Sequence, residues 1–85
     1  MRHVLLTEDT AISFEAPPSI AENLAVTGSS ISFTLSGSGK VEVQVFTEKA
    51  ITNVLADGFN AALQGNILTV DLGATWTTCQ VKLTR

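Results

Sequence analysis

The segment Gly37-Ser38-Gly39-Lys40 has the residue types of a loop that binds phosphate. In such a loop backbone N–H groups and a lysine hold the phosphate, a serine or threonine follows the lysine, and a helix begins there. Here Val41 follows the lysine, and the next residues have the alternating pattern of a strand. We therefore interpret residues 36–40 as a mobile turn and expect no nucleotide at this site.

The residue types used in acid–base or nucleophilic catalysis do not form a recognisable set. The single histidine, His3, has no cysteine or histidine at metal-ligand spacing, and we expect it in an edge strand or a disordered end. Serines are frequent, but no acidic residue is placed to orient this histidine for a Ser–His–Asp triad. Glu42 and Glu48 lack the surroundings of a glycosidase pair. We expect a protein that is not an enzyme, with no catalytic residue and no cofactor.

Acidic residues in expected turns could supply the oxygen ligands that calcium prefers. Their spacing does not match a calcium-binding loop, so turn formation and solubility explain them better than a metal site. No metal is expected. The residues concerned are Glu8, Asp9, Asp57 and Asp71.

The single cysteine, Cys79, is in phase with Val81 and Leu83. It is therefore expected to be a small buried apolar side chain and not a nucleophile. One cysteine cannot form an internal disulfide, so the redox compartment is left open.

Trp76 is the side chain whose type most suggests contact with a ligand, because the apolar face of an indole can stack on a sugar ring. The alternatives are that it plugs the open end of the domain or packs on a neighbouring domain. Phe46 follows Val45 out of phase and indicates either a β-bulge or an outward-facing aromatic residue. The candidate ligand or domain contacts are Trp76, Phe46, Asn60 and Gln80.

The elements that must position these residues are β-strands. Apolar residues alternate with polar ones over residues 31–36 and again over residues 41–46, with a four-residue break between the two runs. A period of two is typical of strands with one buried face, and the short break predicts a hairpin. Val43 is expected in the core of this hairpin, together with the other odd-numbered residues of both runs.

Similar runs elsewhere predict about eight short strands, or nine at most, with turn signals about every 7–12 residues. Pro17-Pro18 is expected to stop one strand, and Ser19 with Glu22 has the spacing of a helix-capping box, so residues 19–24 could form at most one helical turn. Asp57-Gly58 and Gly65-Asn66 predict tight turns. The predicted fold is all-β: a small antiparallel β-sandwich, immunoglobulin-like or jelly-roll-like, whose core includes Phe14, Phe33 and Phe59.

The composition fits one domain over residues 1–85, possibly a fragment of a larger protein. Hydrophobic residues make up 45% and charged residues 15%, the net charge is −3, and the five cations are scattered singly. Nucleic acid and membranes are therefore not expected as partners. No apolar segment has the length of a membrane span or a signal peptide. The neutral polar surface is common in extracellular β-domains, so an extracellular location is favoured if the chain belongs to a secreted enzyme.

From Val41 onward the order of strands resembles the accessory, often C-terminal, β-sandwich modules of glycoside hydrolases and other secreted polysaccharide-active enzymes. The resemblance lies in the turn around residues 52–58 and in the segment GNILTVDL at residues 65–72, and covers the second half of the chain. It implies a non-catalytic domain that packs against a catalytic domain, and in some modules binds carbohydrate. The absence of tyrosine and the single tryptophan depart from the carbohydrate-binding pattern.

Three functions follow as hypotheses. The first is a non-catalytic accessory domain that packs against a larger carbohydrate-active or secreted protein through an apolar patch. The second is a carbohydrate-binding module that uses Trp76 over a groove. The third is a phage, pilus or other assembly subunit, a homo-oligomer in which sheet edges pair between copies.

Overall fold

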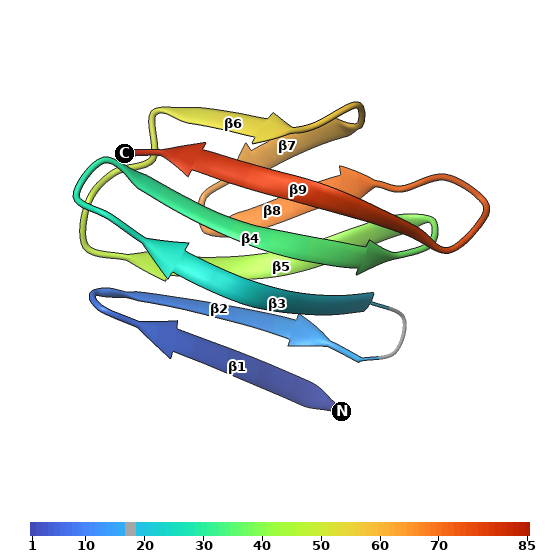
Figure 1. The fold of residues 1–85 in the computed structure, drawn as a ribbon, viewed down its shortest axis with the longest axis horizontal. Helices are drawn as coiled ribbons and strands as arrows, with labels where there is room; N and C mark the ends of the chain where they lie inside the picture. The colour runs from blue at the N-terminus through green and yellow to red at the C-terminus, as the bar shows by residue number, and fades with distance from the viewer. Residues whose placement is uncertain (17–18) are drawn as a thin grey trace.

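The computed structural model describes residues 1–16 and 19–85, and these form nine β-strands with no helix in the described ranges (Figure 1). Each strand is four to eight residues long. The strands are β1 (Arg2–Thr7), β2 (Thr10–Glu15), β3 (Ser19–Val26), β4 (Ser30–Gly37), β5 (Lys40–Thr47), β6 (Asn53–Ala56), β7 (Asn60–Gln64), β8 (Ile67–Asp71) and β9 (Thr77–Thr84).

The strands form two sheets that face each other across one core. A five-stranded sheet has the order β1-β2-β5-β8-β7, and a four-stranded sheet has the order β3-β4-β9-β6. All neighbouring strands are antiparallel. The predicted small antiparallel β-sandwich is thus confirmed. The chain measures 34 × 26 × 21 Å.

The core consists of the alternate residues that each strand turns toward the other sheet. Phe33, Ile12 and Leu68 are among the largest side chains that are fully buried. Phe14 is also buried, whereas Phe59 is only partly buried at the margin of the core. Two of the three phenylalanines predicted for the core are therefore in it, and the third packs against it from the β6–β7 turn.

The prediction that residues 31–46 form a hairpin is wrong, although both strands are present. β4 pairs with β3 and β9, and β5 pairs with β2 and β8, so the two strands lie in different sheets (Figure 1). Alternation tells which face of a strand is buried, but it does not tell whether the next strand lies beside it or across the core. Val43 and Phe33 are both buried, from opposite sheets.

The turn between β4 and β5 is held in place by the loop that follows β8. The backbone N–H of Gly39 donates to the carbonyl of Gly73, and the N–H of Leu72 donates to the carbonyl of Gly39 at 2.9 Å. Gly39 has a φ of 70°, a conformation that glycine adopts without steric cost. Residues 38–39 are therefore an anchored crossover between the sheets, in place of the free hairpin turn that the sequence predicts.

Residues 19–24 form the first part of β3 and not a helical turn. The capping-box spacing of Ser19 and Glu22 has no effect, because residues 19–22 pair with β4. The pairing register shifts between Glu22 and Ala25, and Asn23 has a φ of 59°, so a β-bulge interrupts this edge strand. The predicted stop at Pro17-Pro18 lies outside the described residues.

The two predicted tight turns have different roles. Gly65-Asn66 joins β7 to β8 in a hairpin of the five-stranded sheet, as predicted. Asp57-Gly58 lies between β6 and β7, which belong to different sheets, and Gly58 has a φ of 79°. As at Gly39, a sequence signal for a turn does not distinguish a hairpin from a crossover.

Candidate functional site

The outer face of the five-stranded sheet carries large apolar side chains that contact no part of the core. Leu6 of β1 lies opposite Ala11 of β2, and Ala11 lies opposite Phe46 of β5. Directly opposed residues in neighbouring strands have side chains on the same face. The three residues therefore form one row across three strands.

Two further apolar side chains extend this row. Val4 is two residues before Leu6 in β1 and hence on the same face, and Ile67 of β8 lies opposite Gln44 of β5, diagonal to Phe46. The exposed fractions are 62% for Val4, 75% for Leu6, 46% for Phe46 and 37% for Ile67. We call Val4, Leu6, Ala11, Phe46 and Ile67 the apolar patch. Exposed apolar patches on small domains usually mark contact surfaces.

The core fixes the outward direction of the patch. Ile12, Val45 and Leu68 each directly adjoin a patch residue in sequence and are buried. Since successive side chains in a strand point to opposite faces, the patch residues must point outward. β2 and β5 pair in a continuous register through Phe46. Phe46 is thus an outward-facing aromatic residue, and the alternative of a β-bulge does not apply.

A polar network borders the patch. The guanidinium of Arg2 donates from Nε to the hydroxyl of Ser13 at 2.8 Å and from Nη2 to Oε1 of Gln44 at 2.7 Å. Its Nη1 lies 3.7 Å from a carboxylate oxygen of Glu15. The side chain is thereby drawn across β2 and β5, away from the edge formed by β1. These polar groups lie beside the row Leu6–Ala11–Phe46, and Ser13 and Gln44 stand between Val4 and Ile67 in the register.

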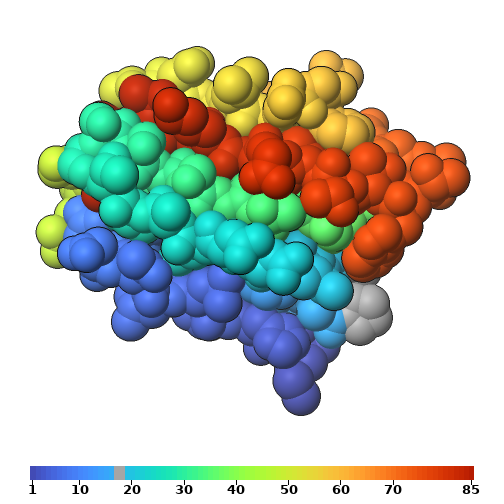
Figure 2. Space-filling model, viewed as in Figure 1, coloured from blue at the N-terminus to red at the C-terminus, as the bar shows by residue number. Residues whose placement is uncertain are grey.

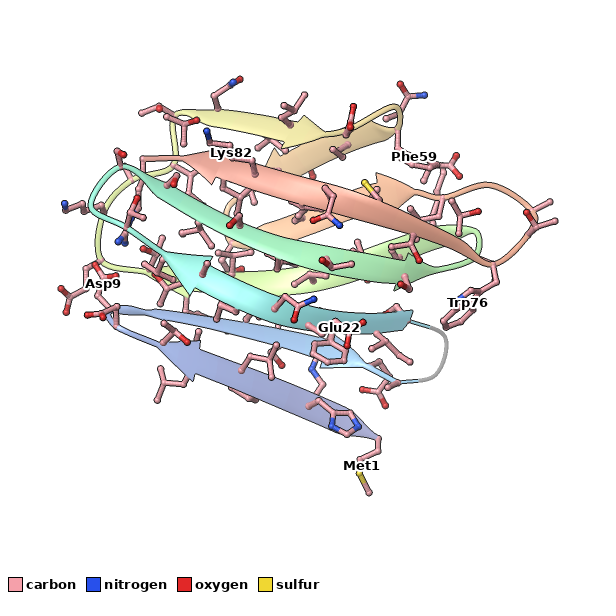
Figure 3. The ribbon with its side chains drawn as sticks, in the orientation of Figure 1. Met1, Asp9, Glu22, Phe59, Trp76 and Lys82 are labelled. Carbon is pink, nitrogen blue, oxygen red and sulfur yellow. The ribbon has the colours of Figure 1, made fainter. Side chains whose placement is uncertain are left out.

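Trp76 is exposed, with 57% of its surface accessible. It lies in the loop between β8 and β9, and Figure 3 shows its ring at the end of the sandwich opposite to Asp9. This exposure excludes the interpretation that the indole plugs the core. Contact of Trp76 with a ligand or a neighbouring domain stays a prediction.

The structure does not bring the four predicted contact residues together. Phe46 and Asn60 are on the outer face of the five-stranded sheet but near opposite ends of it. Gln80 is on the outer face of the four-stranded sheet, where its Oε1 accepts a hydrogen bond from Thr34 at 3.1 Å. Trp76 lies in a loop. They do not form a single ligand site.

Asn60 belongs to a second feature of the outer face, a shallow polar depression of about 350 Å³. Register places Asn60 opposite Asp71, and Asp71 opposite Lys40, in one row across β7, β8 and β5. The Asp71 carboxylate accepts a hydrogen bond from the backbone N–H of Gly73 at 3.1 Å. Its lining contains no aromatic side chain, so the depression offers hydrogen bonds but no stacking surface.

The acidic residues considered for calcium lie at three separate places: Glu8 and Asp9 in the β1–β2 turn, Asp57 in the β6–β7 turn and Asp71 at the end of β8. The carboxylate of Asp9 forms an ion pair with the guanidinium of Arg85, with an N–O distance of 2.7 Å. The same guanidinium donates a hydrogen bond to the hydroxyl of Thr47 at 2.7 Å and another to the carbonyl of Thr27 at 2.6 Å. The Arg85 hydrogen bond holds the pKa of Asp9 below its ordinary value. Through these contacts the side chain of Arg85 connects the β1–β2 turn, the β3–β4 turn and the end of β5.

Metal-ligating side chains and the single cysteine were the remaining candidates for chemistry. No cluster of three metal-ligating side chains occurs among residues 1–16 and 19–85. Cys79 is buried as predicted, and burial raises the pKa of its thiol, the opposite of what a nucleophile needs. No helix long and apolar enough to cross a membrane occurs in the described part of the chain.

Sequence reasoning identified Phe46 but missed Val4, Leu6 and Ile67. The signal was present as pairs of adjacent apolar residues within strands, such as Leu5-Leu6 and Ile67-Leu68. A strand with one solvated face alternates strictly, so two successive large apolar residues indicate that the outer face also carries an apolar side chain.

The chain was compared with known proteins, and no family model, no curated protein and no solved structure matches it. The class that can be stated is the one that the fold defines, a small antiparallel β-sandwich. Because a fold of this kind serves many functions, function has to be argued from the surfaces just described.

Proposed function

We propose that the chain is a non-catalytic β-sandwich domain that packs against a larger protein through the outer face of its five-stranded sheet. The observation that carries this proposal is the row Leu6–Ala11–Phe46, flanked by Val4 and Ile67. These side chains are held outward by a regular register, and none of them supports the core. Burying them against a partner would gain roughly 25 cal/mol per Å² of apolar surface.

The resemblance of the second half of the chain to accessory modules suggests which kind of protein this partner is. On that basis the larger protein is a secreted polysaccharide-active enzyme, and the patch faces its catalytic domain. The two parts of the proposal have different support. The docking face rests on geometry, whereas the nature of the enzyme rests on the resemblance alone.

Hydroxyl-radical footprinting tests the docking face. The protein is oxidised in a native extract of the cells that make it and, separately, after purification to a single chain. We expect Leu6 and Phe46 to react more slowly in the extract, since a bound partner shields them. Leu55, 56% exposed on the four-stranded sheet, is the matched control and should react equally in both samples. Equal oxidation of Leu6 in both samples contradicts the proposal.

A second candidate function is carbohydrate binding through Trp76, and the exposure of its indole favours it. A sugar ring that stacks on the face of an indole makes an apolar contact, and this contact needs only an accessible indole ring. In the same footprinting experiment, a panel of soluble polysaccharides is added to the purified chain. This function predicts slower oxidation of Trp76 with at least one of them. An unchanged rate with every polysaccharide rejects it.

A further inference from the structure

The strand β1 forms a free edge of the five-stranded sheet, and the direction of its unpaired backbone groups can be derived. Met1 and Ala16 exchange two backbone hydrogen bonds, of 2.9 and 3.0 Å. In an antiparallel ladder such hydrogen-bonded pairs alternate with pairs whose N–H and C=O groups point away from the partner strand. Since Arg2 pairs with Glu15 next in the register, the groups of Arg2, Val4 and Leu6 point out of the sheet.

The other three edges are less able to accept a strand. β3 is interrupted by the bulge at Asn23, which has a φ of 59°. β6 has four residues and β7 five, whereas β1 has six in unbroken register with β2. Bulges and short strands are the devices by which proteins protect sheet edges. β1 has neither, and in Figure 2 it forms the lower rim of the molecule.

The side chains of β1 do not protect this edge. A charged residue on an edge strand usually discourages pairing, but the one charged side chain of β1, that of Arg2, is bound across the sheet to Ser13 and Gln44. Val4 and Leu6 leave an apolar outer face beside the free backbone groups. The edge therefore offers three donors and three acceptors with an apolar flank.

We infer that β1 pairs antiparallel with β1 of a second copy, around a two-fold axis at Val4. In this register Val4 lies opposite Val4 of the other copy and Arg2 opposite Leu6, so all the outward N–H and C=O groups are used. The two five-stranded sheets become one continuous sheet, and the two apolar patches become one surface.

The positions of the charged residues at the two ends of the edge favour the antiparallel orientation, although the guanidinium of Arg2 stays in the hydrogen bonds of its own sheet. Each edge has a cation at its start, Arg2, and an exposed acid just past its end, Glu8, which has no ion pair in the described part of the chain. Antiparallel pairing brings the Arg2 end of one copy to the Glu8 end of the other. Parallel pairing would place like charges together. The edge is thus complementary to itself.

The dimer is expected to be weak. Stable interfaces bury roughly 1,200–2,000 Å², and pairing of six-residue edges alone falls below this range. We therefore expect association at protein concentrations on the order of 0.1–1 mM. Sedimentation equilibrium of the complete chain over this range should show the mass rising toward that of two copies. A constant monomer mass up to about 1 mM overturns the inference.

Cysteine cross-linking tests the register. Directly paired Cα atoms lie about 5.5 Å apart, within the range that a disulfide spans. Val4→Cys should therefore form a covalent dimer on mild oxidation. Leu6→Cys is the matched control, because the two copies of this residue would lie about 13 Å apart along the strands. The wild-type chain, with Cys79 buried, should form none. Equal cross-linking of both variants contradicts the register.

Two variants at Val4 test the edge, and Phe46→Lys tests the part of the docking face that lies away from it. Val4→Pro removes an N–H that the β1–β2 ladder does not use, and Val4→Lys places two like charges on the axis. Both should keep the wild-type circular dichroism and be monomeric at the highest concentration. If both variants dimerise, or if only Phe46→Lys abolishes the dimer, the copies associate elsewhere and the inference fails. The footprinting result for the docking face does not depend on this outcome.

Discussion

Arg85 shows how a single side chain can connect two turns and the end of a strand. It is 3% exposed, and its donors reach Asp9 in the β1–β2 turn, Thr27 in the β3–β4 turn and Thr47 at the end of β5. A buried guanidinium requires such partners, because an unpaired buried charge is strongly destabilising. These contacts of Arg85 lie at the end of the sandwich that is near the apolar patch.

The Asp9–Arg85 pair predicts a loss of stability in acid. Because the pKa of Asp9 is lower in the folded chain, its ion pair stabilises the fold above the ordinary aspartate pKa of about 3.9 and is lost as the pH falls through the lower folded value. Thermal unfolding followed between pH 6 and pH 2 should show a smaller acid-induced fall in Tm for Asp9→Asn than for the wild type. Glu8→Gln, at an exposed neighbouring acid, is the control and should behave like the wild type. An equal fall for Asp9→Asn and the wild type contradicts the role of this pair.

At the scale of the residue, the sequence predicted burial better than contacts. Cys79 and Phe33 lie in the core as their phase required, and Phe46 faces outward, which was one of two alternatives. The Asp9–Arg85 pair was not predictable, because its members are 76 positions apart and meet only through the arrangement of both sheets. Periodicity reports the face on which a side chain lies and carries no information on long-range partners.

Strand β5 is the element on which the account of the core depends. It lies at the centre of the five-stranded sheet, between β2 and β8, and its residues Val41, Val43 and Val45 are buried. The same strand presents Gln44 and Phe46 outward to the candidate docking face. One strand therefore serves both the core and the surface.

Val43→Asp should unfold the domain, since it places a carboxylate in the core at a residue that is 0% exposed. An uncompensated buried charge costs about 4 kcal/mol or more, a large part of the stability of so small a chain. Ser38→Ala, in the crossover between the sheets, is the control and should change stability by less than about 0.5 kcal/mol. Urea denaturation followed by circular dichroism measures both. A folded Val43→Asp variant would show that the assigned register is wrong.

At the scale of the element, strand positions were predictable but strand partners were not. The runs at residues 31–36 and 41–46 are the strands β4 and β5, and the number of strands, nine, is the upper one predicted, whereas residues 19–22 pair with β4 although a local capping signal predicted a helical turn. The crossover at Gly39 was predicted as a hairpin turn and the one at Gly58 as a tight turn, because the same glycine conformation serves hairpins and crossovers. The choice between them depends on packing of the whole core, which a local pattern cannot contain.

For the whole molecule, the predicted sandwich is correct. Its candidate contact surfaces can be identified only once the order of the strands in the sheets is known. Val4, Leu6 and Phe46 belong to segments that are 40 residues apart, and they become one patch because β1, β2 and β5 are neighbours. The free edge of β1 likewise depends on its terminal place in that order. The proposal of a docking face and the inference of a paired edge both rest on this topology.

The most direct test of the docking face is photo-cross-linking from inside the apolar patch. A benzophenone-bearing phenylalanine analogue replaces Phe46, and in a matched variant it replaces Leu55 on the opposite sheet. Both proteins are irradiated in the cells that make them, and cross-linked peptides are identified by mass spectrometry. The account predicts a reproducible adduct to one surface of one larger protein from position 46 and none of this adduct from position 55. No adduct from position 46, or the same adducts from both positions, would contradict it.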